Sequence, residues 1–175
     1  MLVPTSIIVG RERRGFATRD GTVTAEAQLS RDELARACAE AMWRDDRASQ
    51  GLGMEITAIG PGRATLAMTI QPHMVNGHGI AHGGFIFTLA DSAFAFACNT
   101  QNERTVAAQG SITFIRPGKL GNRVVAEARE ISRSGRSGIY DVRVSVDDTV
   151  IAEFRGHSRS IGGALIPAIA IDDPT

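Results

Sequence analysis

Residues 83–98 of the chain read GGFIFTLADSAFAFAC, a run that is apolar or small throughout except for Asp91. A helix that is apolar on all sides is a buried helix, so this run predicts a helix at the centre of the core. Asp91 is also the only formal charge between Arg63 and Glu103. A lone ionised carboxylate in such a place costs several kcal/mol unless a partner compensates it. Such a position is typical of a functional group, and Asp91 is therefore the first candidate catalytic residue. The alternative is a buried structural acid that caps a neighbouring backbone group or pairs with an arginine.

The composition of the chain excludes several classes of protein. Its 175 residues predict one domain, which is long enough to bury a core without disulfides or metals. The 19 basic and 19 acidic side chains cancel, which argues against nucleic acid or an acidic membrane surface as a partner. No apolar run reaches the length of a transmembrane helix. Cys38 and Cys98 lie in apolar helical patterns, which predicts buried, reduced thiols and a cytoplasmic location.

The remaining elements follow from capping signals and periodicity. Ser30 and Glu33 form a capping-box pattern that predicts a helix over 31–46. Strands are predicted over 52–59 and 63–70, followed by a loop of glycines and histidines over 71–81 and the buried helix over 83–99. The second of these strands should place Ala64, Leu66, Met68 and Ile70 on one face.

Four strands are predicted after the buried helix, over 106–115, 123–132, 138–146 and 149–160. The short spacing of the last three predicts an antiparallel meander. We therefore expect an α+β domain over 31–163, with an antiparallel sheet wrapped around the long buried helix. Residues 1–30 lack sustained periodicity and are interpreted as a poorly ordered leader rather than a signal peptide. Residues 164–175 are interpreted as a C-terminal tail.

The segment just before the buried helix reads NGHGIAHGG over residues 76–84. Glycines at a helix start let a ligand approach the backbone, and the first N–H groups of a helix have no internal acceptor. Together with the helix dipole, such groups can stabilise a carbonyl that develops negative charge. Gly83 and Gly84 are therefore candidate site residues, although glycines at this point are also typical of close packing. Asn76 before a glycine is typical of a turn.

Gly83 and Asp91 are too far apart to act on one atom within a single chain. Eight residues of helix rise by about 12 Å. Two copies related by a two-fold axis would instead bring the helix start of one copy to the carboxylate of the other. This predicts a homodimer with shared sites.

A stripe of small or polar residues along the same helix favours this interpretation, because it allows a second backbone or a thin ligand to approach closely. Thr88 and Ser92 of this stripe are candidate substrate-binding residues. The full stripe comprises Gly84, Thr88, Asp91, Ser92, Ala95 and Asn99.

Other polar residues are weaker candidates. His73, His78 and His82 lie near each other in sequence, but no cysteine or carboxylate completes a metal site, and none is predicted. Several cations in turns are candidates to contact the phosphates of a nucleotide, and two of them, Arg116 and Arg136, are taken as candidate substrate-binding residues. The others are Lys119, Arg133 and Arg159.

These motifs resemble the hotdog-fold acyl-CoA thioesterases, and most closely the PaaI subgroup of phenylacetic acid degradation. The resemblance covers residues 33–163. It rests on Asn76, His82-Gly83-Gly84, Leu89, Asp91 and Ala93. It rests also on the segments FIRPG at 114–118, GIYDV at 138–142 and FRGHS at 154–158.

The resemblance implies a hotdog fold and hydrolysis of an aryl- or short- to medium-chain acyl-CoA, with no cofactor because coenzyme A is part of the substrate. It implies that the Gly83 N–H polarises the thioester carbonyl and that Asp91 of the facing subunit is nucleophile or general base. Asn76 and His82 would line the reacting centre. Homodimers that assemble further into a homotetramer are implied as well. Some members place a hydroxyl four positions after the carboxylate, where this chain has Ala95, so Ser92 or Thr88 would have to supply any such support.

Two other functions remain open from the residues alone. His82 and Asp91 are also the residue types that a hydratase or dehydratase of enoyl and hydroxyacyl thioesters requires. A non-catalytic acyl-CoA-binding protein could use the same pocket. The acyl chain is not specified by the sequence, and the helix aromatics Phe85, Phe87, Phe94 and Phe96 are the candidate apolar walls.

Overall fold

The protein is described here by a computed structural model over residues 29–166. The predicted leader up to residue 28 and the predicted tail from residue 167 lie outside the described residues. Within residues 29–166, no helix combines the length and the apolar character that crossing a bilayer requires.

Helix α1 (Arg31–Asp45) begins at the predicted capping box. The Ser30 hydroxyl accepts a hydrogen bond from the Glu33 N–H at 3.2 Å, and the Glu33 carboxylate accepts one from the Ser30 N–H at 2.9 Å. A short helix, α2 (Arg47–Gly51), follows it and was not predicted. Leu52 ends that helix, so the first strand begins at Glu55 rather than at residue 52.

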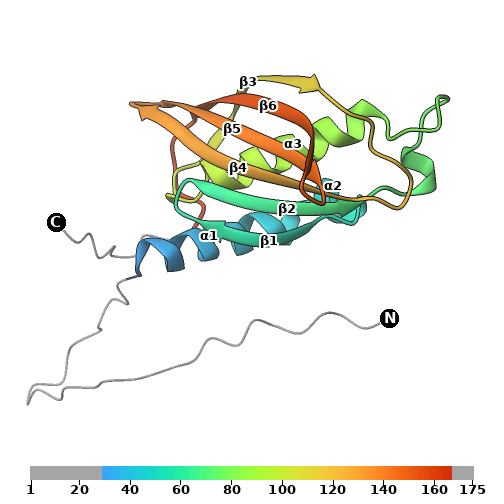
Figure 1. Ribbon diagram of the computed structural model, residues 1–175. Coiled ribbons are helices and arrows are strands. Elements are labelled where there is room, and N and C mark those ends of the chain that lie inside the picture. Colours follow the sequence, from blue (N-terminus) through green and yellow to red (C-terminus); the bar gives the residue numbers. More distant parts are fainter. Residues whose placement is uncertain (1–28, 167–175) are drawn as a thin grey trace, which may run out of the picture.

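Six antiparallel strands form one sheet in the order β1-β2-β4-β5-β6-β3 (Figure 1). The meander β4-β5-β6 confirms the prediction from turn spacing, and strand β3 lies at one edge of the sheet. The strands are β1 (Glu55–Gly60), β2 (Arg63–Thr69), β3 (Thr105–Phe114), β4 (Arg123–Ser134), β5 (Ser137–Val146) and β6 (Thr149–Ser160). The loop before the buried helix contains the 3-10 turn η1 (Pro72–Met74).

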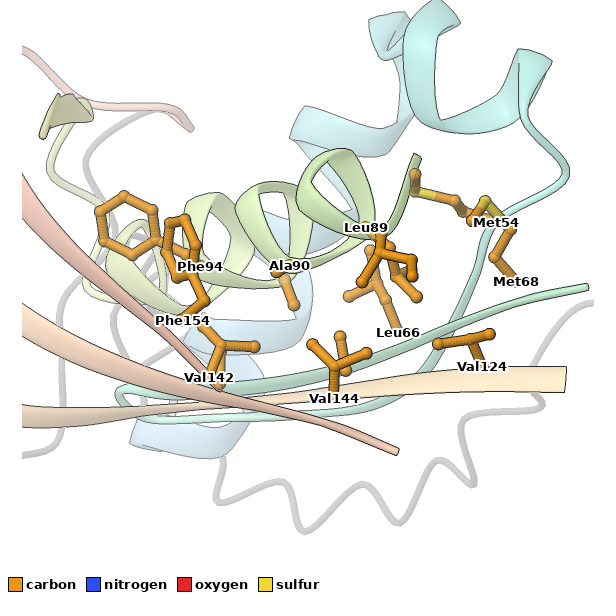
Figure 2. Packing of buried hydrophobic residues seen from close by; sticks show 14 of the residues in the cluster. Met54, Leu66, Met68, Leu89, Ala90, Phe94, Val124, Val142, Val144 and Phe154 are labelled. Carbon is orange, nitrogen blue, oxygen red and sulfur yellow. The ribbon is translucent and has the colours of Figure 1, made fainter. Parts of the chain in front are cut away.

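Helix α3 (Gly83–Cys98) is the predicted central helix and packs across one face of the sheet. Figure 2 shows Leu89, Ala90 and Phe94 directed toward the strand side chains of the core. All three are fully buried, and the Phe94 ring lies 5.4 Å from that of Tyr140 and 5.9 Å from that of Phe154. Burying each large apolar side chain of this kind contributes about 1.5–3 kcal/mol.

The predicted inner face of β2 is confirmed. Ala64, Leu66, Met68 and Ile70 are each no more than 3% exposed. The prediction of a central buried helix is confirmed, with eight residues of α3 buried. On its stripe of small or polar residues, Thr88, Asp91, Ser92 and Ala95 are half-buried and Gly84 is exposed, so this side of the helix is open in the single chain.

Candidate functional site

The start of α3 leaves one backbone donor free. His82 is the N-cap, and its Nδ1 accepts a hydrogen bond from the Gly84 N–H at 2.9 Å. The Phe85 N–H donates to the His82 carbonyl at 3.0 Å. Within residues 29–166, the Gly83 N–H donates to no acceptor. The first turn therefore presents the donor of Gly83 at the positive end of the helix dipole.

The N-cap hydrogen bond also fixes the tautomer of the neutral His82 ring. A nitrogen that accepts a hydrogen bond carries no proton, so a neutral ring with Nδ1 in this role carries its proton on Nε2. The ring lies edge-on to Phe85 at 6.2 Å between centroids. His82 thus offers an N–H donor through Nε2 beside the free donor of Gly83.

Asn76 organises the loop that leads into the helix. Its Oδ1 accepts hydrogen bonds from the N–H groups of His78 at 2.9 Å and Ile80 at 3.4 Å. Its own N–H donates to the Ile80 carbonyl at 2.8 Å. The side-chain oxygen of Asn76 therefore stabilises the turn, as the sequence suggested. Its side-chain Nδ2 donates to no acceptor in the described part of the chain and is available to a ligand.

Asp91 lies on the open side of α3 without a partner. Among the described residues, no side chain or backbone group makes a hydrogen bond or an ion pair with its carboxylate. Burial raises the pKa of this carboxyl above its ordinary value. A half-buried acid that no cation compensates is typical of a functional group rather than of a structural one.

The neighbouring thiol is not a competing nucleophile. Cys98 lies two turns further along the same helix and is buried. Burial raises the pKa of its thiol to about 12, which leaves the thiol un-ionised at neutral pH. Asp91 is therefore the reactive group that α3 can offer.

The remaining stripe residues are held by the protein itself. The Thr88 hydroxyl donates to the Gly84 carbonyl at 2.8 Å. The Ser92 hydroxyl lies 3.0 Å from that of Ser49, a buried residue of the unpredicted helix α2. Asn99 is buried and donates to the carbonyls of Ala95 and Thr105, both at 2.9 Å. Its role is to end the helix.

Comparison with known proteins identifies the family. Residues 78–153 match the family model described as the Thioesterase superfamily. The chain is 40% identical over 128 residues to acyl-coenzyme A thioesterase PaaI of Escherichia coli, covering 73% of this chain and 91% of that protein. The chain belongs to the PaaI group of hotdog-fold acyl-CoA thioesterases.

Solved structures confirm the hotdog fold. The E. coli PaaI protein from the phenylacetic acid degradation operon superimposes with a TM-score of 0.75 at 38% identity, covering 76% of this chain and 97% of that one. A mutant of the phenylacetic acid degradation protein PaaI from Thermus thermophilus gives a TM-score of 0.65 at 36% identity, covering 66% of this chain and 100% of that one. The predicted fold, family and class of enzyme, a thioester hydrolase, are confirmed.

The two candidate arginines of this thioesterase are not brought together. The Arg116 guanidinium donates to the Val150 carbonyl at 2.9 Å, at the start of β6. The Arg136 guanidinium donates to the Ser160 carbonyl at 3.1 and 2.7 Å, at the end of the same strand. Val150 and Ser160 are ten residues apart along the strand, or about 33 Å, so both cations cannot bind one phosphate group in a single chain.

The aromatic walls proposed for this thioesterase divide into two pairs. Phe94 and Phe96 are core residues, 0% and 1% exposed, and are unavailable to a substrate. Phe85 and Phe87 are less completely buried and remain candidates. An aromatic residue that was not among the predicted site residues, Phe114 at the end of β3, lies directly against Gly83. Its alternation with Gly110 and Ile112 along that strand is the sequence signal that could have found it.

Gly83 and Asp91 are both partly exposed in the single chain. A surface cavity of about 390 Å³ lies instead at the far end of the sheet, where its lining includes Gln109, Ser132, His157 and Arg159. It includes neither Gly83 nor Asp91. In the part of the chain that the structure describes, no three metal-ligating side chains come together.

Proposed function

We propose that this thioesterase hydrolyses acyl-CoA to a free acid and coenzyme A at a site shared by two copies of the chain. One observation carries the proposal: among the described residues, the Gly83 N–H on α3 has no acceptor and the Asp91 carboxylate has no partner. These groups lie eight residues apart on one rigid helix, or about 12 Å. One copy would supply the Gly83 donor and the facing copy would supply Asp91.

The reaction begins with the thioester carbonyl accepting a hydrogen bond from the Gly83 N–H. The positive end of the helix dipole then stabilises the negative charge that the oxygen gains during attack. Asp91 of the facing protomer acts on the carbonyl carbon from its open stripe. The raised pKa of Asp91 makes its carboxylate a stronger base than that of an ordinary aspartate.

Two routes are compatible with this arrangement. In the first, an Asp91 oxygen bonds to the carbonyl carbon, the C–S bond breaks, and the thiolate leaves and takes up a proton from solvent. Water then cleaves the mixed anhydride and restores the carboxylate. In the second, Asp91 takes a proton from water as the hydroxide attacks, and that proton passes to the thiolate as the C–S bond breaks. Neither route uses a metal or a cofactor.

His82 and Asn76 supply the polar surroundings of the carbonyl. The His82 Nε2–H and the Asn76 Nδ2–H are donors with no acceptor among the described residues. Both belong to the loop and cap that precede Gly83. We assign them to orienting the thioester and the attacking water of an aryl- or short- to medium-chain acyl-CoA.

The edge of the sheet supports a dimer. Strand β3 pairs only with β6 among the described strands, and most of its ten residues are exposed. Val106 and Phe114 on it are 45% and 52% exposed. An unpaired edge of this length can pair with a strand of a second chain. Strand β3 also contacts α3, and the open stripe of that helix carries Asp91. In a dimer with its two-fold axis beside β3, the second copy would cover both the exposed edge of β3 and the open stripe of α3. We propose that such homodimers assemble further into tetramers.

We place the enzyme in the cytoplasm. Its two cysteines, Cys38 and Cys98, are free and buried, as expected of a chain that folds in a reducing compartment.

The Gly83 donor is tested with a matched pair of variants. Gly83→Pro removes the N–H at a helix position that tolerates proline, and Gly83→Ala adds a similar Cβ but keeps the N–H. Release of free CoA thiol should fall by a factor of roughly 100–1000 in Gly83→Pro relative to Gly83→Ala, the usual effect of removing one such donor. Equal rates in the two variants would exclude Gly83 as the donor.

An assay of enoyl-CoA hydration on the wild type tests the alternative activity, that of a hydratase or dehydratase of enoyl and hydroxyacyl thioesters.

Mixing of subunits tests the shared site. Gly83→Pro and Asp91→Asn chains are each expected to be inactive, and they are unfolded and refolded together in equal amounts. Random pairing makes half of the dimers mixed, and each mixed dimer has one intact site, so about a quarter of the wild-type activity should return. No recovery from correctly assembled mixed dimers would show that both groups act within one protomer.

A further inference from the structure

We propose that Phe114 determines which acyl groups this enzyme accepts, by forming the apolar wall on which the acyl group packs beside the Gly83 donor. The inference rests on the proposed function and assigns a specificity role to a residue outside the catalytic set.

Phe114 touches the residue that carries the proposed donor. Three of its ring carbons lie 2.8–3.2 Å from the point where a Cβ on Gly83 would stand. The ring therefore covers the Cα of Gly83. A carbonyl oxygen bonded to the Gly83 N–H would lie about 2.9 Å from that nitrogen, which brings the substituents of the carbonyl carbon within van der Waals reach of the ring.

The register of β3 explains why this ring is not part of the core. A Cβ on Gly110 would meet Phe154 and Phe87, and Ile112 packs against the core, so alternate residues of β3 face α3. Phe114 continues this row to the first residue of the helix, where the core ends. It is 52% exposed, and it is the only aromatic among the large exposed hydrophobic side chains of the described residues.

The surroundings of Gly83 differ in polarity from one side to the other. The loop side carries the donors of His82 and Asn76, which have no acceptor in the described part of the chain, whereas the strand side carries the Phe114 ring. The pantetheine arm of coenzyme A contains two amides that need hydrogen-bond partners, and a hydrocarbon acyl group contains none. The acyl group therefore lies on the Phe114 side, where an aromatic acyl group gains most from ring packing.

The test compares kcat/KM for phenylacetyl-CoA and acetyl-CoA in the wild type, Phe114→Leu and Phe114→Ala. Phe114→Ala should lose about 10- to 100-fold on phenylacetyl-CoA and less than about threefold on acetyl-CoA, with Phe114→Leu between it and the wild type. Ile115→Ala is the matched control. Ile115 is 47% exposed and is the next residue along the chain, and this variant should leave both values unchanged.

The outcomes separate this inference from the proposed function. A wild type that releases no CoA from either substrate overturns the proposed function and the inference together. An active wild type in which Phe114→Ala weakens both substrates equally overturns the inference alone. Light scattering reports whether each variant keeps the assembly of the wild type. If the Phe114→Ala variant dissociates, the test uses the Phe114→Leu variant that keeps its assembly. An unchanged ratio of kcat/KM for phenylacetyl-CoA to kcat/KM for acetyl-CoA in that variant would overturn the inference.

Discussion

The Nδ1 of His82 accepts a hydrogen bond from the Gly84 N–H, at 2.9 Å, and so begins the helix that carries Asp91. Gly84 fits this contact because a Cβ there would stand 3.1 Å from the same nitrogen. The bond uses the second N–H of the helix, and the first, that of Gly83, has no acceptor within residues 29–166. One side chain thus sets the helix start, the tautomer of its own ring and the position of the free donor.

The two roles of His82 can be separated by substitution. His82→Ala removes the cap and should lower the free energy of unfolding by about 1 kcal/mol. His82→Asn restores a side-chain acceptor at the N-cap and should recover that stability, but it lacks the ring that carries Nε2–H. Urea unfolding and CoA-thiol release measure the two effects, and full activity in His82→Asn would contradict a role for the ring donor.

The rate should depend on pH through Asp91. The carboxylate is the reactive form in both proposed routes, and burial raises the pKa of this group in the folded protein. The rate should therefore rise with pH, with the midpoint of its acid limb above the ordinary aspartate value of about 3.9. The pH profile of kcat/KM measures this midpoint. A midpoint at or below the ordinary value would mean that the carboxyl is not desolvated in the active enzyme.

The same shift predicts that Asp91 lowers stability at neutral pH. A folded-state pKa above the unfolded value means that the folded protein binds the proton more tightly. The wild type should therefore lose stability as pH rises from the ordinary aspartate value through the raised one. Asp91→Asn lacks this dependence. Asp91→Asn should be more stable than the wild type at neutral pH, and the difference in free energy of unfolding should shrink as the pH falls below the ordinary aspartate value. Parallel denaturant titrations of the two proteins measure this difference.

Two glycines in contact with aromatic rings should respond differently to alanine. A Cβ on Gly156 would stand 2.9 Å from ring carbons of Phe94, which is fully buried and cannot move. Gly156→Ala should cost about 1–3 kcal/mol of stability. Gly83→Ala meets the tip of the half-exposed Phe114 ring, which can rotate away, and should cost less. Equal losses in urea unfolding would mean that the two rings are equally confined.

The contact between Ser49 and Ser92 tests whether Ser92 serves the substrate or the fold. Ser92→Ala leaves the buried Ser49 hydroxyl without its partner and should cost about 1–3 kcal/mol. Ser49→Ala combined with Ser92→Ala removes both hydroxyls and should recover part of that loss. A double-mutant cycle measures the coupling, and unchanged CoA release in the double variant would remove Ser92 from the substrate-binding residues.

Much of this fold could be predicted because its local signals agree with its tertiary structure. The capping box at Ser30, the apolar run of α3 and the alternation in β2 each act over a few residues, and each appears where expected. The short helix α2 carries no apolar period, so its presence, and with it the contact between Ser49 and Ser92, could not be read from the sequence.

The site was predictable only in part. Asp91 stands out as a lone charge in an apolar helix, and Gly83 stands out as a glycine at the predicted helix start, where the first N–H groups have no internal acceptor. The directions of the helix aromatics depend on how α3 is rotated against the sheet, which composition alone does not specify. Likewise, the separation of Arg116 from Arg136 follows from the pairing of β6 with its neighbours.

The rigidity of α3 limits which insertions and deletions the chain can tolerate. One residue added between Gly83 and Asp91 would turn everything beyond it by about 100° and advance it by about 1.5 Å. The carboxylate would then leave the open stripe and point toward the packed sheet. Length variation among related enzymes should therefore be confined to surface loops, while this eight-residue interval keeps a constant length.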